Sequence, residues 1–136
     1  MDEAQLRVLL ARYEELIRSL EVQKGLLEES IAETEDIIWG LEALPEEGGE
    51  AMVPLVGDVL LRATLGPKDK VLYYAGSNVY IAHPVREVVE RLRERIRVLR
   101  EALDGVNDRL AQLAVEYRSL LSYVRVPAEE AKGPEK

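Results

Sequence analysis

The sequence contains no cysteine and only one histidine, His83, in 136 residues. A chain without cysteine can form neither a disulfide framework nor a thiolate metal site. A single histidine with no tight carboxylate cluster beside it also falls short of the usual set of zinc ligands. The same composition cannot supply a nucleophile together with its base and orienting residue. We therefore expect no enzymatic activity, no metal site and no cofactor.

Long apolar runs are missing as well. No stretch approaches the roughly 20 apolar residues that a membrane-spanning helix requires. The first residues, MDEAQLRVLL, are acidic and amphipathic and do not resemble a signal peptide. The segment GPKDK, residues 66–70, lacks the spacing and the Ser or Thr of a phosphate-binding loop. These features predict a cytoplasmic protein that does not interact with membranes.

Charged residues, by contrast, are abundant and mostly acidic. They make up 32% of the chain, and the formal net charge is −8. This surplus of negative charge argues against a main role in binding nucleic acid, whose phosphates it would repel. A surface rich in both signs is typical of ion-pair networks, which are common in proteins of heat-loving organisms.

The second half of the chain carries a strong helical pattern. Apolar or aromatic residues recur there at alternating spacings of four and three, with mostly charged residues between them. Pro84 suits a first helical turn, and Pro127 follows soon after the last apolar position. The pattern predicts a helix over residues 84–125 with a coiled-coil seam. The expected seam residues are Val85, Val89, Leu92, Ile96, Leu99, Leu103, Val106, Leu110, Leu113, Tyr117, Leu120 and Val124.

The first half repeats this pattern less cleanly and predicts a helix over residues 4–44. Pro45 and the Gly48-Gly49 pair are expected to end it. Polar residues thin the stripe at mid-length, where Gln23, Ser30 and Thr34 stand. The expected stripe is Leu6, Leu9, Tyr13, Leu16, Leu20, Gln23, Leu27, Ser30, Thr34, Ile37, Leu41 and Leu44.

Neither helix is expected to be stable alone in water, and the simplest partner for each is the other. Antiparallel pairing with residue numbers summing to about 130 would bring Tyr13 to Tyr117 as an aromatic layer. It would also set the acidic segment 28–36 beside the arginine-rich segment 93–101. We interpret these arginines as members of an ion-pair ladder, and a nucleic-acid patch is the alternative.

Short strands separated by turns are predicted between the helices, over residues 51–82. Apolar residues alternate along them, and GPKD and GSN mark sharp turns. Both faces of these two hairpins are largely apolar, and isolated hairpins are marginal in water. We therefore expect the strands to pair with other chains and to build an oligomeric body. The expected assembly residues are Val59, Leu61, Leu65, Val71, Tyr73, Val79 and Ile81.

This arrangement resembles a prefoldin subunit of the α class. The resemblance covers nearly the whole chain, and its local matches are VPLVGDVLLRATL (53–65), DKVLYYAGSNVYIA (69–82) and HPVREVVERLRERI (83–96). The α class carries two β-hairpins where the β class carries one, and this chain has the pattern for two. The expected fold is thus mostly α with a small β component. It is an antiparallel coiled-coil helical hairpin whose two central β-hairpins join an intersubunit β-barrel body.

What the resemblance implies is a hexamer of two α and four β subunits. It implies a chaperone that holds unfolded client polypeptides without ATP and passes them to a group II chaperonin. Residues 1–127 would form the single domain, and the charged segment 128–136 reads as a disordered tail. A holdase needs apolar groups beyond those that join its helices. The candidates near the chain ends are Val8, Leu10, Tyr13, Ile17, Tyr117, Leu121 and Tyr123.

Two other interpretations remain open. The chain could be a coiled-coil scaffold or tether that its β-hairpins oligomerise, without binding clients. It could also be a helical arm that binds nucleic acid through Arg86, Arg93, Arg97 and Arg100. The first predicts a dimer that does not suppress aggregation, and the second predicts salt-sensitive binding of RNA or DNA.

Overall fold

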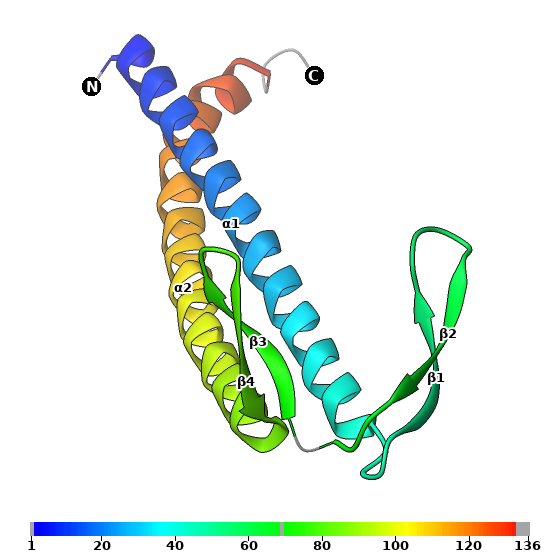
Figure 1. Cartoon of the computed structure of the whole chain (residues 1–136). Helices are drawn as coiled ribbons and strands as arrows, with labels where there is room; N and C mark the ends of the chain where they lie inside the picture. The colour runs from blue at the N-terminus through cyan, green and yellow to red at the C-terminus, as the bar shows by residue number, and fades with distance from the viewer. Residues whose placement is uncertain (1, 69, 133–136) are drawn as a thin grey trace. The chain divides into compact units, whose positions relative to one another are not determined.

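The structure, a computed structural model, describes residues 2–68 and 70–132, and the surroundings of side chains as far as residue 124. Two long helices enclose two β-hairpins in the chain order, as the sequence predicts (Figure 1). The elements are α1 (Glu3–Ala43), β1 (Gly49–Pro54), β2 (Leu60–Leu65), β3 (Lys70–Gly76), β4 (Val79–Pro84) and α2 (Val85–Lys132).

The chain divides into two compact units, and both helices contribute to each of them. The terminal unit comprises the residues up to Ser30 and those from Leu99 onward, so it contains only helical segments. The hairpin unit comprises Ile31–Val98, with all four strands and the adjoining ends of the helices.

The predicted seam of α2 is confirmed. Val85, Val89, Leu92, Ile96 and Leu113 are buried, and the other predicted seam residues are half-buried. Between them the surface positions are mostly charged and exposed. The helix therefore presents one continuous apolar stripe, as the four-three spacing requires.

Helix α2 ends later than predicted. It continues through Pro127 to Lys132, although the sequence pattern predicts an end at residue 125. An interior proline removes one donor and its ring clashes with the carbonyl four residues earlier, but its φ is compatible with a helix, and the following Ala-Glu-Glu-Ala-Lys residues are strong helix formers. The end of the predicted tail, residues 133–136, lies outside the described residues.

The predicted stripe of α1 is wrong at Leu16, Gln23 and Ile37, which are exposed, whereas its other predicted residues are buried or half-buried. Leu16 and Ile37 are 45% and 49% exposed, whereas Ile31 and Ile38 are each 7% exposed. At these places the buried stripe contains the next residue along the chain, Ile17 in place of Leu16 and Ile38 in place of Ile37. Its members, all buried or half-buried, are Leu6, Leu10, Tyr13, Ile17, Leu20, Lys24, Leu27, Ile31, Thr34, Ile38 and Leu41.

Paired apolar residues explain this error. Leu9-Leu10, Leu16-Ile17 and Ile37-Ile38 offer an apolar side chain at both neighbouring positions, so spacing alone cannot choose between them. The Ser30-Ile31 pair distinguishes the predicted stripe from the observed one, because only the observed stripe, which passes through position 31, buries the isoleucine. The same choice leaves Gln23 exposed, whereas Ser30 remains half-buried.

The terminal unit is held in antiparallel register by two crossed tyrosine–glutamate pairs. The Tyr117 hydroxyl donates a hydrogen bond of 2.6 Å to Oε1 of Glu14. Tyr13 lies close to Glu116, and burial together with this carboxylate raises the pKa of the Tyr13 phenol. Both contacts agree with the predicted register. In place of the predicted aromatic layer, each tyrosine therefore meets a carboxylate on the other helix.

The hairpin unit has its core at the ends of both helices. Ile31, Thr34 and Ile38 of α1 and Val88 and Leu92 of α2 are buried there. An ion pair of 3.0 Å between Arg93 and Glu42 joins the two helix ends on the surface, although Glu42 lies outside the acidic segment 28–36 that the sequence pairs with residues 93–101. The strands therefore emerge from a packed helical base.

Both hairpins are antiparallel, and each forms its own two-stranded sheet. In the first, Val53 pairs with Leu61 across β1 and β2. In the second, Tyr73 pairs with Ile81 across β3 and β4, with an irregularity between Tyr74 and Gly76. Ser77 and Asn78 have φ angles of 50° and 61°, which is the geometry of a tight hairpin turn whose twist matches the strands.

A glycine closes the base of the first hairpin. Gly48 has a φ of 78° and donates a 3.1 Å backbone hydrogen bond to the carbonyl of Pro45. A Cβ on this residue would collide with the carbonyl groups of Leu65 and Gly66. Both the backbone angle and the close approach therefore require glycine.

We predict that Gly48→Ala lowers the free energy of unfolding by at least about 2 kcal/mol, because it adds a backbone collision to an unfavourable φ. Gly40→Ala is the matched control, since this exposed helical glycine has open space around its Cβ. The control should instead raise stability by up to about 1 kcal/mol through helix propensity. Chemical denaturation followed by circular dichroism measures both, and equal stability of the two variants would contradict the role of Gly48.

The tyrosine pairs predict a dependence on alkaline pH. The pKa of Tyr117 is raised above 10.0 by its hydrogen bond to Glu14, and that of Tyr13 is raised by burial and by Glu116. A raised tyrosine pKa means that the folded state favours the neutral phenol. This stabilisation is complete below the unfolded pKa and is lost as the pH rises through the folded value.

The melting temperature should therefore fall more steeply above about pH 10 in the wild type than in the double variant Tyr13→Phe/Tyr117→Phe. The remaining tyrosines are common to both proteins and give the same background. Parallel alkaline melting curves for the two proteins would show that these phenols carry no pH-dependent stability.

Candidate assembly and polypeptide-binding surfaces

The first hairpin exposes apolar side chains on both faces. Residues paired across antiparallel strands share a face, so Val53 and Leu61 lie on one side, and Pro54 and Leu60 on the other. Met52, Leu60 and Leu61 are all more than half exposed. A two-stranded ribbon with two uncovered apolar faces lacks the packing that hairpins need in water. These faces are therefore suited to be covered by other strands.

The second hairpin has one face anchored and one face open. The Tyr73 hydroxyl accepts a 3.0 Å hydrogen bond from Arg95 of α2, and its ring meets His83 edge-on at 6.3 Å. On the opposite face Tyr74 and Tyr80 contact each other with ring centroids 5.2 Å apart, beside the 69% exposed Leu72. The open aromatic face is an apolar surface of the kind that protein partners cover.

The predicted assembly residues divide between these environments. Val59, Leu61, Val79 and Ile81 are exposed. Leu65, Val71 and Tyr73 are half-buried within the hairpin unit. The predicted set lacks four further apolar residues of the strands that are at least half exposed, namely Leu60, Leu72, Tyr74 and Tyr80. The alternation of apolar residues on both sides of each strand was the signal that could have identified them.

The predicted client-binding residues also divide. Val8 and Tyr123 are 62% and 68% exposed on the terminal unit. The others are half-buried, because they belong to the helix-to-helix seam or lie at its edge. They are Leu10, Tyr13, Ile17, Tyr117 and Leu121.

Helix α1 also exposes apolar residues that the sequence pattern did not indicate. Leu16, Val22 and Leu26 are all exposed in the terminal unit, and Leu26 is 62% exposed. Near the start of the same helix, Val8 and Leu9 line a hollow together with Ala4, Gln5 and Arg12. The adjacent apolar residues in α1 were the signal, because one member of each pair must lie outside the seam.

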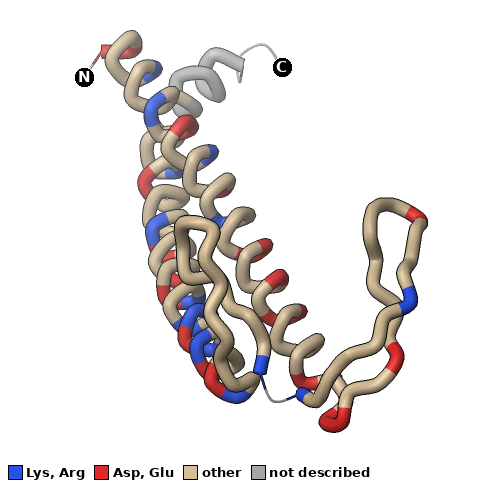
Figure 2. The backbone as a smooth tube through the Cα atoms, in the orientation of Figure 1, with Lys and Arg blue, Asp and Glu red and all other residues tan. Residues whose placement is uncertain are grey.

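Charge is distributed unevenly along the helices. Beyond Lys24 every charged residue of α1 is acidic, as Figure 2 shows along the tube. The opposing part of α2 is rich in arginine, and Arg93 is bound to Glu42. Within α2, Arg97 lies 2.6 Å from Glu94 and lowers the pKa of that carboxyl. These contacts support the interpretation of the arginines as ion-pair partners.

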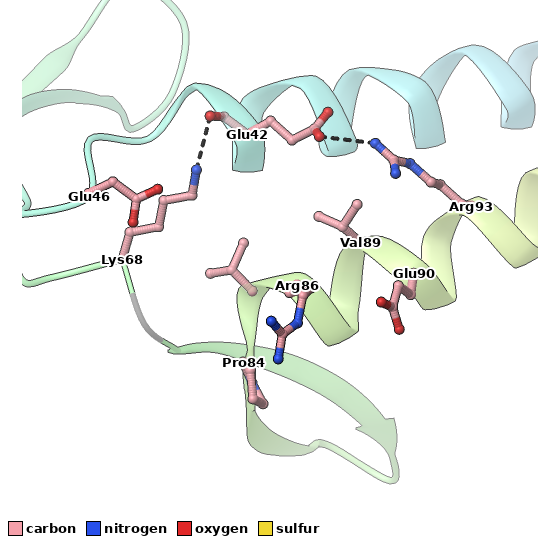
Figure 3. Close-up of a pocket in the computed structure, with 9 residues that line it drawn as sticks. Glu42, Glu46, Lys68, Pro84, Arg86, Val89, Glu90 and Arg93 are labelled. Carbon is pink, nitrogen blue, oxygen red and sulfur yellow. Dashed lines mark hydrogen bonds and ion pairs between the residues drawn. The ribbon is translucent and has the colours of Figure 1, made fainter.

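A pocket at the base of the hairpin unit collects charged groups of both signs (Figure 3). The Nζ of Lys68 donates a 2.9 Å hydrogen bond to the backbone carbonyl of Glu42, whose carboxylate is held by Arg93. Glu46, Arg86 and Glu90 line the rest. The Lys68 and Arg93 contacts tie the loop before β3 and the start of α2 to the end of α1, so this pocket joins elements of the fold.

The residues that the structure describes, 2–68 and 70–132, lack two features that other kinds of site would need. Among those residues there is no group of three or more His, Cys, Asp or Glu side chains arranged to hold a metal ion. None of the helices within the same residues is long and apolar enough to cross a membrane.

Comparison with known proteins identifies the family. The family model described as "Prefoldin subunit" matches residues 13–130. A protein named prefoldin subunit alpha from Thermofilum pendens is 29% identical over 87% of this chain and 90% of its own length. A protein of the same name from Hyperthermus butylicus is 27% identical over 90% of this chain and 80% of its own.

A solved structure has the same fold. The cryo-EM structure of filamentous prefoldin from Methanocaldococcus jannaschii matches with a TM-score of 0.73 and 20% sequence identity, over 85% of this chain and 98% of that one. The two helices and two antiparallel hairpins are the prefoldin fold, in which the β-barrel forms between subunits, so a single chain contains no closed barrel. The family model matches 118 of the chain's residues, from 13 to 130, which is well over half of its length. The chain therefore belongs to the prefoldin family.

Proposed function

We propose that this chain is the α-class subunit of a cytoplasmic, ATP-independent holdase of two α and four β subunits. Its helices would pair as a coiled-coil arm, hold unfolded polypeptides near the arm's free end and deliver them to a group II chaperonin. The two units share both helices, so we treat residues 1–127 as one domain. We expect no enzymatic activity and no cofactor.

The uncovered apolar faces of the hairpins carry this proposal. Side chains such as Leu61, Leu72 and Tyr80 are at least half exposed in the single chain. Burial of apolar surface contributes about 25 cal/mol per Å², so a shared barrel would stabilise these strands strongly. Relatives named as prefoldin α subunits support the same assembly.

The assembly test replaces one exposed apolar residue on each hairpin. Leu61→Asp/Ile81→Asp should abolish the complex with a β-class prefoldin subunit, because a buried unpaired carboxylate is strongly unfavourable. Native mass spectrometry should find the variant chain alone, with its helical circular dichroism retained. Val115→Asp is the control, since Val115 is 63% exposed on α2. If the double variant still forms the full complex, these hairpin faces are not the interface.

Holding of clients is proposed for the exposed apolar side chains of the terminal unit. Val8 and Tyr123 are accessible, whereas Leu10 and Ile17 also support the contact between the helices. Non-directional apolar contact accepts many client sequences, and the surrounding charges would limit self-association.

Val8→Ser/Tyr123→Ser should reduce the suppression of aggregation of a chemically unfolded client by about half or more, because it removes accessible apolar area. Light scattering of the diluted client measures the effect in the assembled complex without nucleotide. The matched variant Arg7→Ser/Ser122→Ala changes neighbouring surface residues and should hold clients as the wild type does. Full holding activity of Val8→Ser/Tyr123→Ser in an intact complex would exclude these residues as a client surface.

A scaffold or tether without client binding is the second candidate function. It is favoured by the half-buried state of most predicted client residues. Under this alternative the complex forms through the hairpins, yet it never suppresses aggregation at any concentration.

A further inference from the structure

The second hairpin has two faces of similar chemistry. Residues paired across antiparallel strands share a face, so Tyr73 and Ile81 lie on one side. Tyr74 and Tyr80 form the next pair and lie on the other side. Leu72 precedes Tyr74 by two positions and shares its face. Each side combines tyrosine with aliphatic residues, so apolar character alone does not decide which side a partner meets.

The two faces nevertheless differ in exposure. Leu72, Tyr74 and Tyr80 are all more than half exposed, and we call these three residues the open face. Val71 and Tyr73 are half-buried, and we call their side the anchored face. The pairing within the hairpin treats both sides alike, because side chains alternate evenly along each strand. The difference therefore arises from contacts outside the hairpin.

The base of the hairpin is attached to both helices. Strand β4 ends at Pro84 and α2 begins at Val85, so chain continuity joins this corner to α2. Lys68 precedes β3, and its Nζ donates a 2.9 Å hydrogen bond to the backbone carbonyl of Glu42 in α1. Both attachments lie at the end of the ribbon where Lys70 pairs with Pro84. A ribbon that is attached at one end can still turn about that end.

A hydrogen bond further along β3 opposes this rotation. Arg95 of α2 donates a 3.0 Å hydrogen bond to the Tyr73 hydroxyl. Tyr73 stands three residues beyond Lys70, which is about 10 Å along an extended strand. The donor is a cation, and charge-assisted hydrogen bonds are stronger than neutral ones. The contact therefore acts at a distance from the point of rotation and keeps the anchored face toward α2.

The Tyr73 ring makes a separate contact within the hairpin. It meets the His83 ring edge-on, with centroids 6.3 Å apart. The Nδ1 of His83 lies 3.8 Å from a carboxylate oxygen of Glu87 near the start of α2. A phenylalanine at position 73 would keep the ring contact and lose only the hydroxyl. The tie to α2 can thus be removed without removing the packing of the ring.

We propose that Tyr73 is a positioning residue, whose hydrogen bond with Arg95 turns the open face of the second hairpin toward the strands of another prefoldin-family subunit. The fold indicates this partner, since the β-barrel of the prefoldin fold forms between subunits. The inference rests on the proposed assembly and names the side of the hairpin that takes part in it. Tyr73 then acts through α2, whereas Leu72, Tyr74 and Tyr80 contact the partner.

Removal of one hydroxyl from each face tests the proposal in the complex of the full chain with a β-class prefoldin subunit. Tyr73→Phe should weaken assembly about fivefold, because the ribbon then spends time in orientations that do not dock. Tyr80→Phe should change assembly by less than about twofold, since it keeps the apolar ring that the partner buries. Native mass spectrometry over a concentration series measures both. Wild-type affinity of Tyr73→Phe, or equal loss in the two variants, would overturn the proposal.

A double-mutant cycle tests whether the effect passes through Arg95. Arg95→Met should weaken assembly as much as Tyr73→Phe, and the double variant should lose no more than either single variant, because all three lack the same contact. The helical melting midpoint of the free chain should stay at its wild-type value in each of them. Additive losses, or a fall in the midpoint that parallels the loss of assembly, would contradict a positioning role.

Nitration of tyrosines by tetranitromethane identifies the face that the partner covers. Mass spectrometry with peptide fragmentation follows each tyrosine separately. In the free chain Tyr74 and Tyr80 should react faster than Tyr73, and Arg95→Met should speed the reaction of Tyr73. Formation of the complex should protect Tyr74 and Tyr80. Protection of Tyr73 while the open face stays reactive would assign the partner to the anchored face and overturn the proposal.

One outcome separates this inference from the function on which it rests. A wild-type chain that forms no complex with the β-class subunit overturns the proposed assembly itself. A wild-type complex that Tyr73→Phe leaves unchanged overturns only the role of Tyr73. The nitration rates of the free chain test the tie to Arg95 in either case, and equal rates for Tyr73 in the wild type and in Arg95→Met would disprove it.

Discussion

Burial of an apolar stripe between α1 and α2 is the constraint on which the rest of this molecule depends. Helices of 41 and 48 residues cannot persist alone in water, because propensity contributes too little per turn. Each unit of the chain therefore contains a segment of both helices. In the hairpin unit, the strands are connected to the ends of the paired helices, where Ile38 and Val88 are buried.

The same constraint determines what is left over for partners. Because each helix uses only one stripe for its neighbour, the second member of an apolar pair such as Leu16-Ile17 remains at the surface. The hairpins are an extreme case, since two strands cannot bury either of their own faces. These surplus apolar residues therefore leave uncovered apolar surface both on the hairpins and along the helices.

Polar contacts set the register more than the strength of the pairing. The Tyr117–Glu14 hydrogen bond and the Arg93–Glu42 ion pair lie at exposed positions, where such contacts contribute little stability. They nevertheless specify an antiparallel alignment, because a shift by one heptad would separate every pair. The carboxylates thus act as specificity elements in a seam whose apolar residues would tolerate several registers.

The sequence by itself determined the element order, the α2 seam and the two hairpins, because heptad spacing, strand alternation and turn residues are local signals. It also predicted the antiparallel pairing, with a register that the Tyr117–Glu14 contact confirms. Only the tertiary structure decided which residue of Leu16-Ile17 and Ile37-Ile38 enters the seam, since both are apolar and the choice depends on burying Ile31 across the whole stripe. It likewise decided that Tyr73 anchors its hairpin to Arg95 while Tyr74 and Tyr80 stay open, because a contact between distant segments leaves no local pattern.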